Sequence, residues 1–570
     1  MFRSLCRIVA LSSVPMIGFA ASCATLPSNT EPHVIRSFQP QETPAPVIAP
    51  KPGAEPDLLL RDFFAASAVP TSNYEAARSF LTEQARAAWQ PTDTAMIVDR
   101  LSINTVAGGT GVKRSFSVQG NVIGELRSGG VFTPNRALYD SKVELEQVDG
   151  EWRISSLPNG IVMERTEMRN KYQPHNLYFF NVQGDDLVSD RRWVYNERSS
   201  LDSQLLTMLL DGPSERIKPA VRFDIPGDAA FVGFKDGAYN FSGFGSVDEE
   251  ERLRFAAEVV WMLSSAGTSG PITIKADGDP LIAGIDSVST DDFVDVSPVS
   301  DPLGEEETYA LSNGNLLLVS GGEAKPVAGR LGASADIASA DIGSNATYAV
   351  VRGKEGEQRF AIGVIGGFNH EVARGKNFTR PSFEADPSAV WVVADGERIV
   401  RTVRSAATGE VVSSEVDAEL PEGTEGSISV LRLSRTGARA ALVVDGRLYT
   451  GVVDQDDAGK RSIVNILEYA SDLGGSIISA EWGPDGSLVV GTSNASSPIV
   501  RVEQDGSSTT TLPSGNLTAP VVAVAASSNM YYATDANGTL QLPVSGASES
   551  PNWREVPGLQ GVRSLPITTN

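Results

Sequence analysis

The chain has 570 residues, 41% hydrophobic and 21% charged, a composition ordinary for several globular domains. Its formal charge of −24 would repel nucleic acid and anionic lipid headgroups, which excludes binding to either through surface charge. Of its two cysteines, Cys6 lies in a predicted signal peptide. The single remaining thiol excludes disulfides, and its predicted acylation, described next, excludes thiolate catalysis and cysteine-ligated metal sites.

Residues 1–22 have the pattern of a secretory signal peptide. Arg3 and Arg7 precede an apolar run, Ile8 to Ala21, which is too short to cross a bilayer. Small residues from Ala20 to Ser22 precede Cys23, as in a bacterial lipobox, although Leu is more usual at the position of Ala20. We predict cleavage before Cys23, S-diacylglycerol on its thiol and N-palmitoylation of the new amine. The alternative is ordinary cleavage beside an incidental cysteine.

Residues 23–56 are predicted to form a proline-rich tether. Eight prolines fall within this stretch, and a polyproline chain extends by ~3.1 Å per residue, so the tether can reach on the order of 100 Å. A proline-rich ligand for a groove-type domain is the alternative. Together with the lipobox, the tether predicts a protein anchored by lipid on the extracytoplasmic face of the cell membrane.

Residues 57–170 are predicted to form a small α+β domain. Helical patterns come first, at 58–65, 74–81 and 82–89, and strand patterns follow. In the hairpin over 141–157, Asp149 and Gly150 are the turn, because both central residues of a type I′ turn need positive φ. Helices followed by a curved sheet resemble the NTF2-like or cystatin fold, which can hold a pocket against the sheet.

Residues 171–285 are predicted to form a second α+β domain. Strand patterns at 177–180 and 192–195 precede a helix from Leu201, which Gly212 and Pro213 end. Later elements are a hairpin turning at Asp236-Gly237, a helix with a capping box of Ser246 and Glu249, and a strand that ends at Asp277-Gly278.

The remaining chain is predicted to be an acidic linker, 286–307, and a β-propeller, 308–570. An apolar or aromatic anchor, a turn and an apolar run recur at spacings of 41, 50, 49 and 42, the period of a four-stranded blade. The anchors are Ile342, Phe383, Leu433, Trp482 and Val524. The leftover ends, 308–328 and 561–567, would pair to complete one more blade and remove the open edges, which predicts six blades.

Few residues suggest catalysis or metal binding. Asp454–Gly459 resembles part of a calcium loop, but Asn465 stands where the bidentate Glu is needed, so we favour a solvated hairpin loop. The acids Asp248–Glu251 suit the first turn of a helix better than a metal site. The three histidines are scattered, at His33, His175 and His370, and are interpreted as structural or surface residues. We predict no catalytic residues, metal or cofactor.

The second α+β domain carries a more specific resemblance. The segments Leu209–Ser214, Ile225-Pro226, Glu258–Leu263 and Asp277-Gly278 are similar to the GerMN domain. The order of lipobox, NTF2-like domain, GerMN domain and β-rich half resembles the actinobacterial lipoprotein LpqB family over the whole chain. That resemblance implies an accessory role to the MtrB sensor kinase of the MtrA/MtrB two-component system, through contacts with its extracellular part.

We therefore expect a non-enzymatic, lipid-anchored envelope protein that binds a sensor kinase, with the cell wall as a further contact. Two alternatives remain open: an enzyme acting on cell-wall glycan or peptide with acids at the propeller channel, and a small-ligand carrier using the first domain's sheet. A deep, acid-lined channel with raised carboxyl pKa values would favour the enzyme. A flat apolar rim would instead favour the binding protein.

Overall fold

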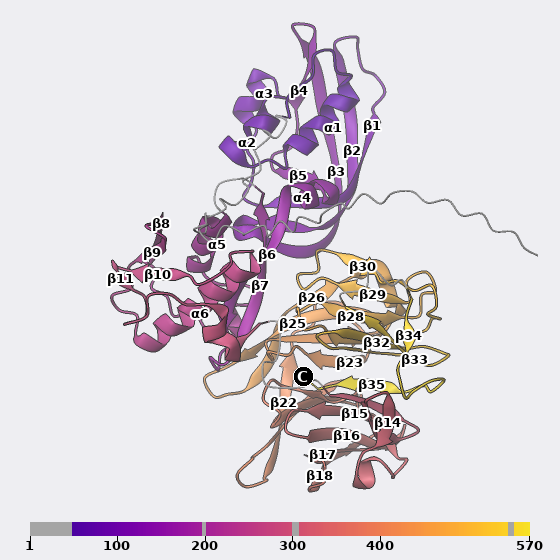
Figure 1. Ribbon diagram of the computed structural model, residues 1–570. Coiled ribbons are helices and arrows are strands. Elements are labelled where there is room, and N and C mark those ends of the chain that lie inside the picture. The colour runs from indigo at the N-terminus through magenta and orange to yellow at the C-terminus, as the bar shows by residue number, and fades with distance from the viewer. Residues whose placement is uncertain (1–47, 197–200, 299–306, 545–551, 570) are drawn as a thin grey trace, which may run out of the picture. The chain divides into compact units, whose positions relative to one another are not determined.

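The computed structural model describes residues 48–196, 201–298, 307–544 and 552–569 (Figure 1). The predicted signal peptide, Cys23 and the tether as far as residue 47 lie outside these ranges, as does 299–306 of the predicted linker. From Ile48 onward the chain forms one compact unit. None of the helices described is long and apolar enough to cross a membrane.

The first domain packs helices against a five-stranded sheet. The helices are α1 (Pro56–Ala66), α2 (Thr71–Arg78), α3 (Glu83–Ala88) and α4 (Arg165–Lys171). The sheet has the order β4-β3-β2-β1-β5, from β1 (Ala95–Thr105), β2 (Lys113–Arg127), β3 (Val131–Val148), β4 (Glu151–Ser156) and β5 (Ile161–Glu164). Neighbouring strands are antiparallel except β1 and β5. The α+β prediction is confirmed.

Local sequence signals explain most boundaries of this domain. The Thr82 hydroxyl accepts from the Ala85 N–H at 3.2 Å and caps α3. Asp149 and Gly150 both have positive φ, at 53° and 84°, in the β3–β4 turn. The predicted helix over 74–81 ends earlier, at Arg78, and although α2 is bounded at Thr71, residues 72–74 have positive φ, so its right-handed turn follows Tyr74.

The second domain joins a two-stranded ribbon to a four-stranded sheet and two helices. The ribbon is β6 (Tyr172–Phe180) with β7 (Leu187–Tyr195), and the sheet has the order β11-β10-β9-β8. Its strands are β8 (Ala230–Lys235), β9 (Ala238–Ser242), β10 (Thr273–Ala276) and β11 (Asp279–Pro280), and the helices are α5 (Leu201–Leu210) and α6 (Glu249–Ser265). Apolar residues of α5, α6, the ribbon and the sheet form one core.

The capping box of α6 lies two residues later than the sequence analysis placed it. Asp248, not Ser246, accepts from the Glu251 N–H at 2.8 Å, and Glu251 accepts from the Asp248 N–H at 2.9 Å. Val247 is buried, which fixes the chain just before the helix and leaves Asp248 as the N-cap. The positive end of the helix dipole also stabilises a carboxylate at this position.

The first part of the predicted acidic linker packs onto the second domain. A 3₁₀ segment, η3 (Thr290–Val296), carries Phe293, which is buried in the core of that domain. The indole Nε1 of Trp261 donates to the Phe293 carbonyl at 3.1 Å. Residues as far as Val296 therefore belong structurally to the second domain.

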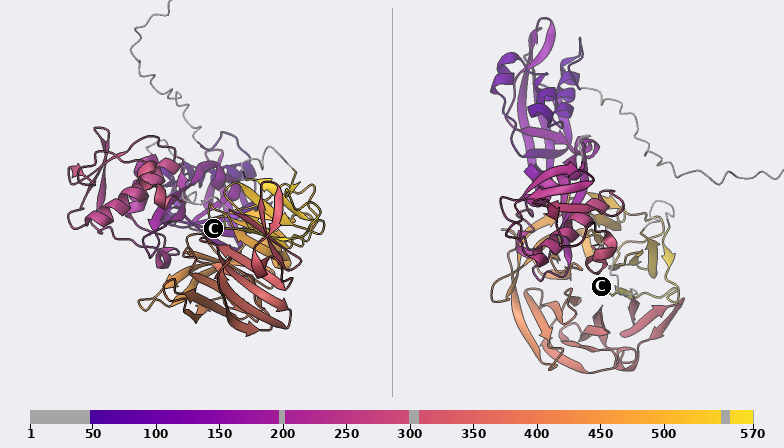
Figure 2. Two further views of the ribbon diagram at one scale, coloured as in Figure 1. Left: turned by 60° about the horizontal axis from the view of Figure 1, so that its bottom comes forward. Right: turned by 60° about the vertical axis from the view of Figure 1, so that its left-hand side comes forward.

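The last domain is a six-bladed β-propeller, as predicted (Figure 2). Blade 1 combines β12 (Thr308–Ser312), β13 (Asn315–Ser320) and β14 (Glu323–Pro326) with β35 (Leu565–Thr568). Blade 2 has β15 (Ile337–Gly343), β16 (Thr347–Lys354), β17 (Glu357–Val364) and β18 (Asn369–Gly375); blade 3 has β19 (Ser382–Phe383), β20 (Ala389–Ala394), β21 (Arg398–Arg404) and β22 (Val411–Ala418). Blade 4 has β23 (Ile428–Leu433), β24 (Arg439–Val444), β25 (Arg447–Gln455) and β26 (Arg461–Tyr469). Blade 5 has β27 (Ile477–Trp482), β28 (Leu488–Thr492), β29 (Ile499–Val502) and β30 (Thr509–Thr511); blade 6 has β31 (Ala523–Ala526), β32 (Met530–Thr534), β33 (Thr539–Pro543) and β34 (Arg554–Glu555).

The two ends of the propeller pair as the sequence analysis predicted. β12 and β35 are antiparallel, with Tyr309 opposite Ile567. Ile567 is fully buried and lies in a core shared by blades 1 and 2. A short parallel pairing between β22 and β26, at Ala418 and Ile463, was not predicted and links blades 3 and 4.

Candidate functional site

The β6–β7 ribbon of the second domain lies at a buried joint between all three domains. Asp190 and Arg192, both at most 5% exposed, stand two residues apart on β7. The Arg192 guanidinium donates to Asp190 at 2.8 Å and, through its other terminal nitrogen, to the carbonyl of Gly129 in the first domain at 2.9 Å. Because a buried guanidinium left without partners is costly, these contacts fix the first and second domains to each other.

The same strand binds the propeller on blade 5. Trp193 Nε1 donates to Asp505 Oδ2 at 2.8 Å, and a terminal nitrogen of Arg191 lies 3.1 Å from Glu503. Asp505 is 8% exposed, and its other oxygen accepts from the backbone and hydroxyl of Ser507. This carboxylate therefore closes a blade turn and holds the second domain at once.

A second set of contacts joins the second domain to blade 4. The Arg216 guanidinium donates to the Thr450 hydroxyl at 2.8 Å and to the Tyr469 hydroxyl, and lies over the Tyr469 ring. Asn465 of β26 donates to the Arg216 carbonyl at 2.9 Å. A small apolar cluster completes the contact: Val188, Ile217, Ala220, Ala438 and Val452. The domains thus share one buried joint.

This joint was not predicted from the sequence. The strand pattern at 192–195 included Arg192 without a partner, and Arg191 was not interpreted, although two consecutive arginines beside apolar residues are unusual for a half-buried strand. That pair was the available signal, because charged residues inside a strand need partners. The partners themselves, Asp505 among them, lie hundreds of residues away and could not be identified from the sequence.

The propeller centre holds a compact cluster of four charged side chains, Asp341, Arg380, Arg432 and Glu481. Asp341 lies 3.0 Å from Arg380 and 3.3 Å from Arg432, and Glu481 lies 2.9 Å from Arg432 and 3.6 Å from Arg380. Burial alone would lower the pKa of Arg432, but the attraction of Asp341 and Glu481 outweighs it and raises that pKa. Each carboxylate is neutralised by two guanidiniums, so this cluster offers no free acid and base.

The inner face of the first domain's sheet is filled by its helices. Phe63 on α1 makes edge-on ring contacts with Phe80 and Trp89, and all three are at most 3% exposed. The apolar side chains of the sheet pack against them in one core. This face therefore acts as a hydrophobic core rather than as an open ligand pocket.

The residues considered for metal binding make structural contacts. Asp456, in the loop between β25 and β26, accepts from the N–H groups of Ala458 and Lys460. Asp248 and Glu251 form the α6 capping box. In the described part of the chain, no three His, Cys, Asp or Glu side chains are placed to share a metal ion. Of the histidines, His175 is half-buried on β6, His370 lies on β18 and His33 falls outside the described residues.

Glu258 is a buried acid of the second domain with a pKa raised into the neutral range. It lies on α6, is 7% exposed, and accepts from the Phe180 N–H at 3.3 Å. Burial raises its pKa to about 8, and the nearby Asp224 adds to this, against the opposing effects of the Phe180 hydrogen bond and Arg254. Glu258 is thus mostly neutral at pH 7.

We expect Glu258 to make the protein less stable as the pH rises. The native carboxyl keeps its proton up to about pH 8, whereas the unfolded carboxyl loses it near 4.5, so unfolding releases a proton between these values. The free energy of unfolding should therefore fall from about pH 5 to 8. Glu258→Gln should remove this fall and stabilise the protein by up to about 3 kcal/mol at pH 7.

Urea unfolding of both proteins at pH 5, 6, 7 and 8 measures this difference. The two should be nearly equal at pH 5 and diverge above it. A constant difference across this range would show that Glu258 does not carry the raised pKa.

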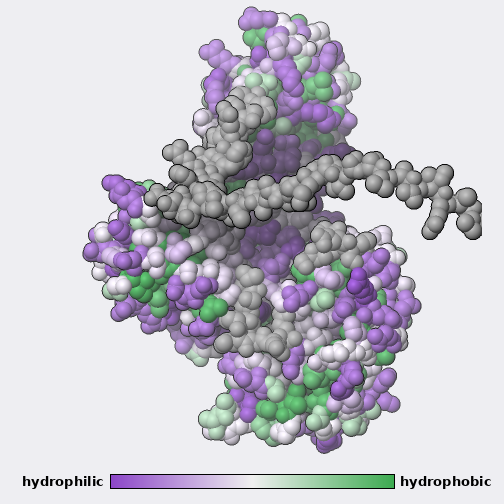
Figure 3. All heavy atoms as spheres, in the orientation of Figure 1, coloured by the Kyte–Doolittle hydropathy of each residue, from purple (hydrophilic) through white to green (hydrophobic). Residues whose placement is uncertain are grey.

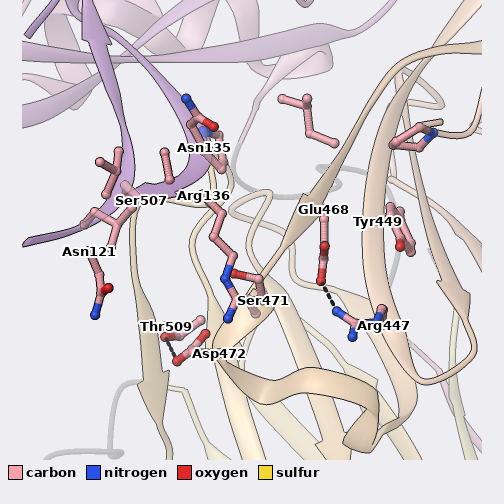
Figure 4. Close-up of a pocket in the computed structure, with 18 of the residues that line it drawn as sticks. Asn121, Asn135, Arg136, Arg447, Tyr449, Glu468, Ser471, Asp472, Ser507 and Thr509 are labelled. Carbon is pink, nitrogen blue, oxygen red and sulfur yellow. Dashed lines mark hydrogen bonds and ion pairs between the residues drawn. The ribbon is translucent and has the colours of Figure 1, made fainter. Parts of the chain in front are cut away.

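Beside the joint, a groove of about 1100 Å³ opens between the first domain and blades 4 and 5 (Figure 4). The first domain contributes Asn121, Asn135, Arg136 and Leu138, and the propeller contributes Tyr449, Glu468, Asp472 and Thr509, among others. Figure 3 shows mostly hydrophilic residues where the surface is hollowed between these domains. The groove is therefore polar.

Some of its charges are paired and others are not. Arg447 and Glu468 form an ion pair at 2.9 Å. Arg136 extends from β3 toward the 3₁₀ segment η5 (Ser471–Ser476), which carries Asp472 (Figure 4). Arg136 and Asp472 form no ion pair within the described chain. The Arg136 guanidinium on one wall and the Asp472 carboxylate on the other are thus available to pair with charged groups of a bound molecule.

Comparison with known proteins divides the chain in the same order. Residues 49–169 match the family described as "Lipoprotein LpqB, N-terminal domain", 176–282 match "Sporulation and spore germination", and 314–568 match "Lipoprotein LpqB beta-propeller domain". Among solved structures, a chain of a nidogen/laminin complex has 10% identity and a TM-score of 0.34, over 46% of this chain and 98% of that one. Streptogramin B lyase has 16% identity and a TM-score of 0.30, over 43% and 76%.

Curated relatives match from end to end. "Lipoprotein LpqB" of Corynebacterium diphtheriae is 38% identical over 98% of this chain and 98% of its own length. That of Corynebacterium jeikeium is 36% identical, over 98% and 97%, and that of Mycolicibacterium smegmatis is 32% identical, over 98% and 99%. With the same three domains in the same order, the chain belongs to the LpqB lipoprotein family.

Proposed function

We propose that this lipoprotein acts without catalysis, as an accessory to an MtrB-like sensor kinase, by binding the kinase's extracellular part. The observation that carries the proposal is the buried joint. Arg192, Trp193 and Arg216 hold three domains as one body, which presents surfaces of different domains at fixed spacing. Such a body is suited to recognising another folded protein.

Two observations favour binding over the alternative functions. An enzyme with acids in the propeller channel would need an unpaired carboxylate, whereas Asp341 and Glu481 are both ion-paired there. A ligand carrier would need an open sheet face in the first domain, whereas Phe63 and Phe80 fill it. The propeller acids that suggested an enzyme and the sheet face that suggested a ligand carrier therefore both have structural roles.

The proposed contact is stoichiometric and of micromolar or weaker affinity, about −8 kcal/mol at best. Confinement of both proteins to one membrane then raises their effective concentration without any new contact. To test this, binding of the purified kinase ectodomain is measured by interferometry, and complementation of a deletion strain is scored at equal expression. Replacement of the anchored protein by a soluble form, or turnover of wall fragments by purified protein, would contradict the proposal.

The anchor gives a direct prediction. Cys23→Ala should move the protein from the membrane fraction to the soluble fraction, because an acyl chain contributes ~0.8 kcal/mol per buried methylene and the acidic surface offers no substitute. Fractionation followed by immunoblotting checks this. Cys6→Ala, inside the signal peptide, is the matched control and should stay in the membrane. Continued membrane association of Cys23→Ala would show a second anchor.

A further inference from the structure

Strand β30, the outer strand of blade 5, has an open edge on the groove. It follows β29 in the blade's strand order and has no neighbour on its other side within the described sheet. The Ser508 carbonyl accepts from the Glu503 N–H at 2.9 Å, and the Leu512 N–H donates to the Ile499 carbonyl at 3.1 Å. Both groups point inward, toward β29.

In an antiparallel ladder, the backbone N–H and C=O groups of successive residues point alternately toward and away from the neighbouring strand, which fixes the orientation of the residues between Ser508 and Leu512. If positions 508 and 512 point toward β29, the backbone N–H and C=O of Thr509 and Thr511 point away from it. Thr509 itself lines the groove. The groove therefore has a backbone donor and acceptor available for another strand.

The other walls suit an extended chain. β22 pairs with β26 only as far as Ile463, and β26 continues past Ile466 to Glu468 along the groove. On the opposite wall, Leu138 of β3 is 67% exposed and Arg136 extends toward η5 (Figure 4). An apolar contact, a cation and a strand edge thus line the same channel.

We propose that this groove binds an extended segment of the kinase ectodomain, which adds as a strand to the edge of β30. The inference rests on the proposed function and names the surface that it uses. Main-chain hydrogen bonds to Thr509 supply affinity, and Arg136 and Asp472 select a segment with an acid facing one wall and a base facing the other.

A wall glycan is the competing occupant, and the lining argues against it. Sugars are held largely by stacking on open aromatic rings. Of the described residues that line the groove, Tyr449 is the aromatic one, and it is 5% exposed. Its ring face is therefore unavailable, whereas the strand edge is open.

The test removes one outward N–H. Proline is tolerated at an edge position whose N–H faces solvent, so Thr509→Pro should preserve β30 and abolish the donor. Thr509→Ala removes the γ-methyl group and the hydroxyl, which contacts Asp472 at 3.5 Å, but keeps the backbone N–H. With lipidated protein in nanodiscs and the purified kinase ectodomain, we expect at least tenfold weaker binding for Thr509→Pro and at most threefold for Thr509→Ala.

A matched proline on another blade controls for general damage. Asn369 on β18 has the same setting, because the Phe368 carbonyl accepts from the Val364 N–H and Asn369 then faces outward. Asn369→Pro should bind like the unmodified protein, and all three variants should melt at the same temperature. Arg136→Glu should also weaken binding about tenfold.

Each outcome decides something. If Thr509→Pro binds the ectodomain as well as Thr509→Ala does, strand addition at this groove is wrong and the accessory role stands. If soluble wall glycan competes with the ectodomain for the groove, the glycan is the occupant and the inference fails. If the unmodified protein does not bind the ectodomain, the proposed function and the inference both fail.

Discussion

Deletion of residues 561–570 is expected to unfold the propeller at temperatures where the full chain is folded. The deletion removes β35, and with it the pairing of Tyr309 with Ile567 and a fully buried side chain. It also removes the Ser564 carbonyl, which accepts from the buried Thr534 hydroxyl at 2.6 Å. An open edge then remains in blade 1, and the buried Thr534 and Thr539 hydroxyls of blade 6 both lose Ser564 as a hydrogen-bond partner.

A milder variant gives the expected size of the effect. Ile567→Ala should lower the free energy of unfolding by about 2–5 kcal/mol, because the cavity lies in a shared core of two blades. Arg554→Ala, at an exposed position on β34, should change it by less than about 0.5 kcal/mol. Thermal and urea unfolding measure both. A truncated protein that melts like the full chain would disprove closure by β35.

Arg432→Met is expected to cost about 3–5 kcal/mol, the second large effect. Arg432 is 3% exposed and binds both Asp341 and Glu481, so its loss leaves two buried carboxylates with only Arg380 to compensate them. The expected result is a lower urea midpoint with an unchanged slope.

An exposed ion pair on the neighbouring blade is the control. Arg398 and Glu415 lie 3.6 Å apart, with both side chains more than half exposed. Arg398→Met should therefore change stability by less than about 1 kcal/mol. Equal losses in the two variants would mean that burial of the central cluster does not determine its contribution.

The propeller was largely predictable because its signals are local and repeated. The turn at Asp485 shows why: its carboxylate accepts from the backbone and hydroxyl of Ser487, and Gly486 takes φ of 78°. Such turns restart a strand at a fixed interval, so anchors such as Leu433 and Trp482 could be aligned. The number of blades then followed from the leftover ends.

The joint and the groove were not predictable because they depend on contacts between distant segments. Asp505 and Asp485 stand in the same Asp-Gly-Ser sequence, and both close a blade turn. Only Asp505 also binds the indole of Trp193, 312 residues away. The shared turn sequence does not reveal this difference, because the indole that binds Asp505 comes from a distant strand. The α6 capping box was likewise misplaced because burial of Val247 depends on tertiary packing.

The joint has a consequence for how this protein can diversify over evolution. A domain that shares Trp193, Arg192 and Arg216 with its neighbours cannot be exchanged by recombination unless the incoming segment supplies complementary groups at every contact. Exchange of single domains is thereby disfavoured. We expect substitutions to accumulate while the order of the three domains stays unchanged. Relatives that align with this chain along nearly their whole length are the lineage pattern expected from such a constraint.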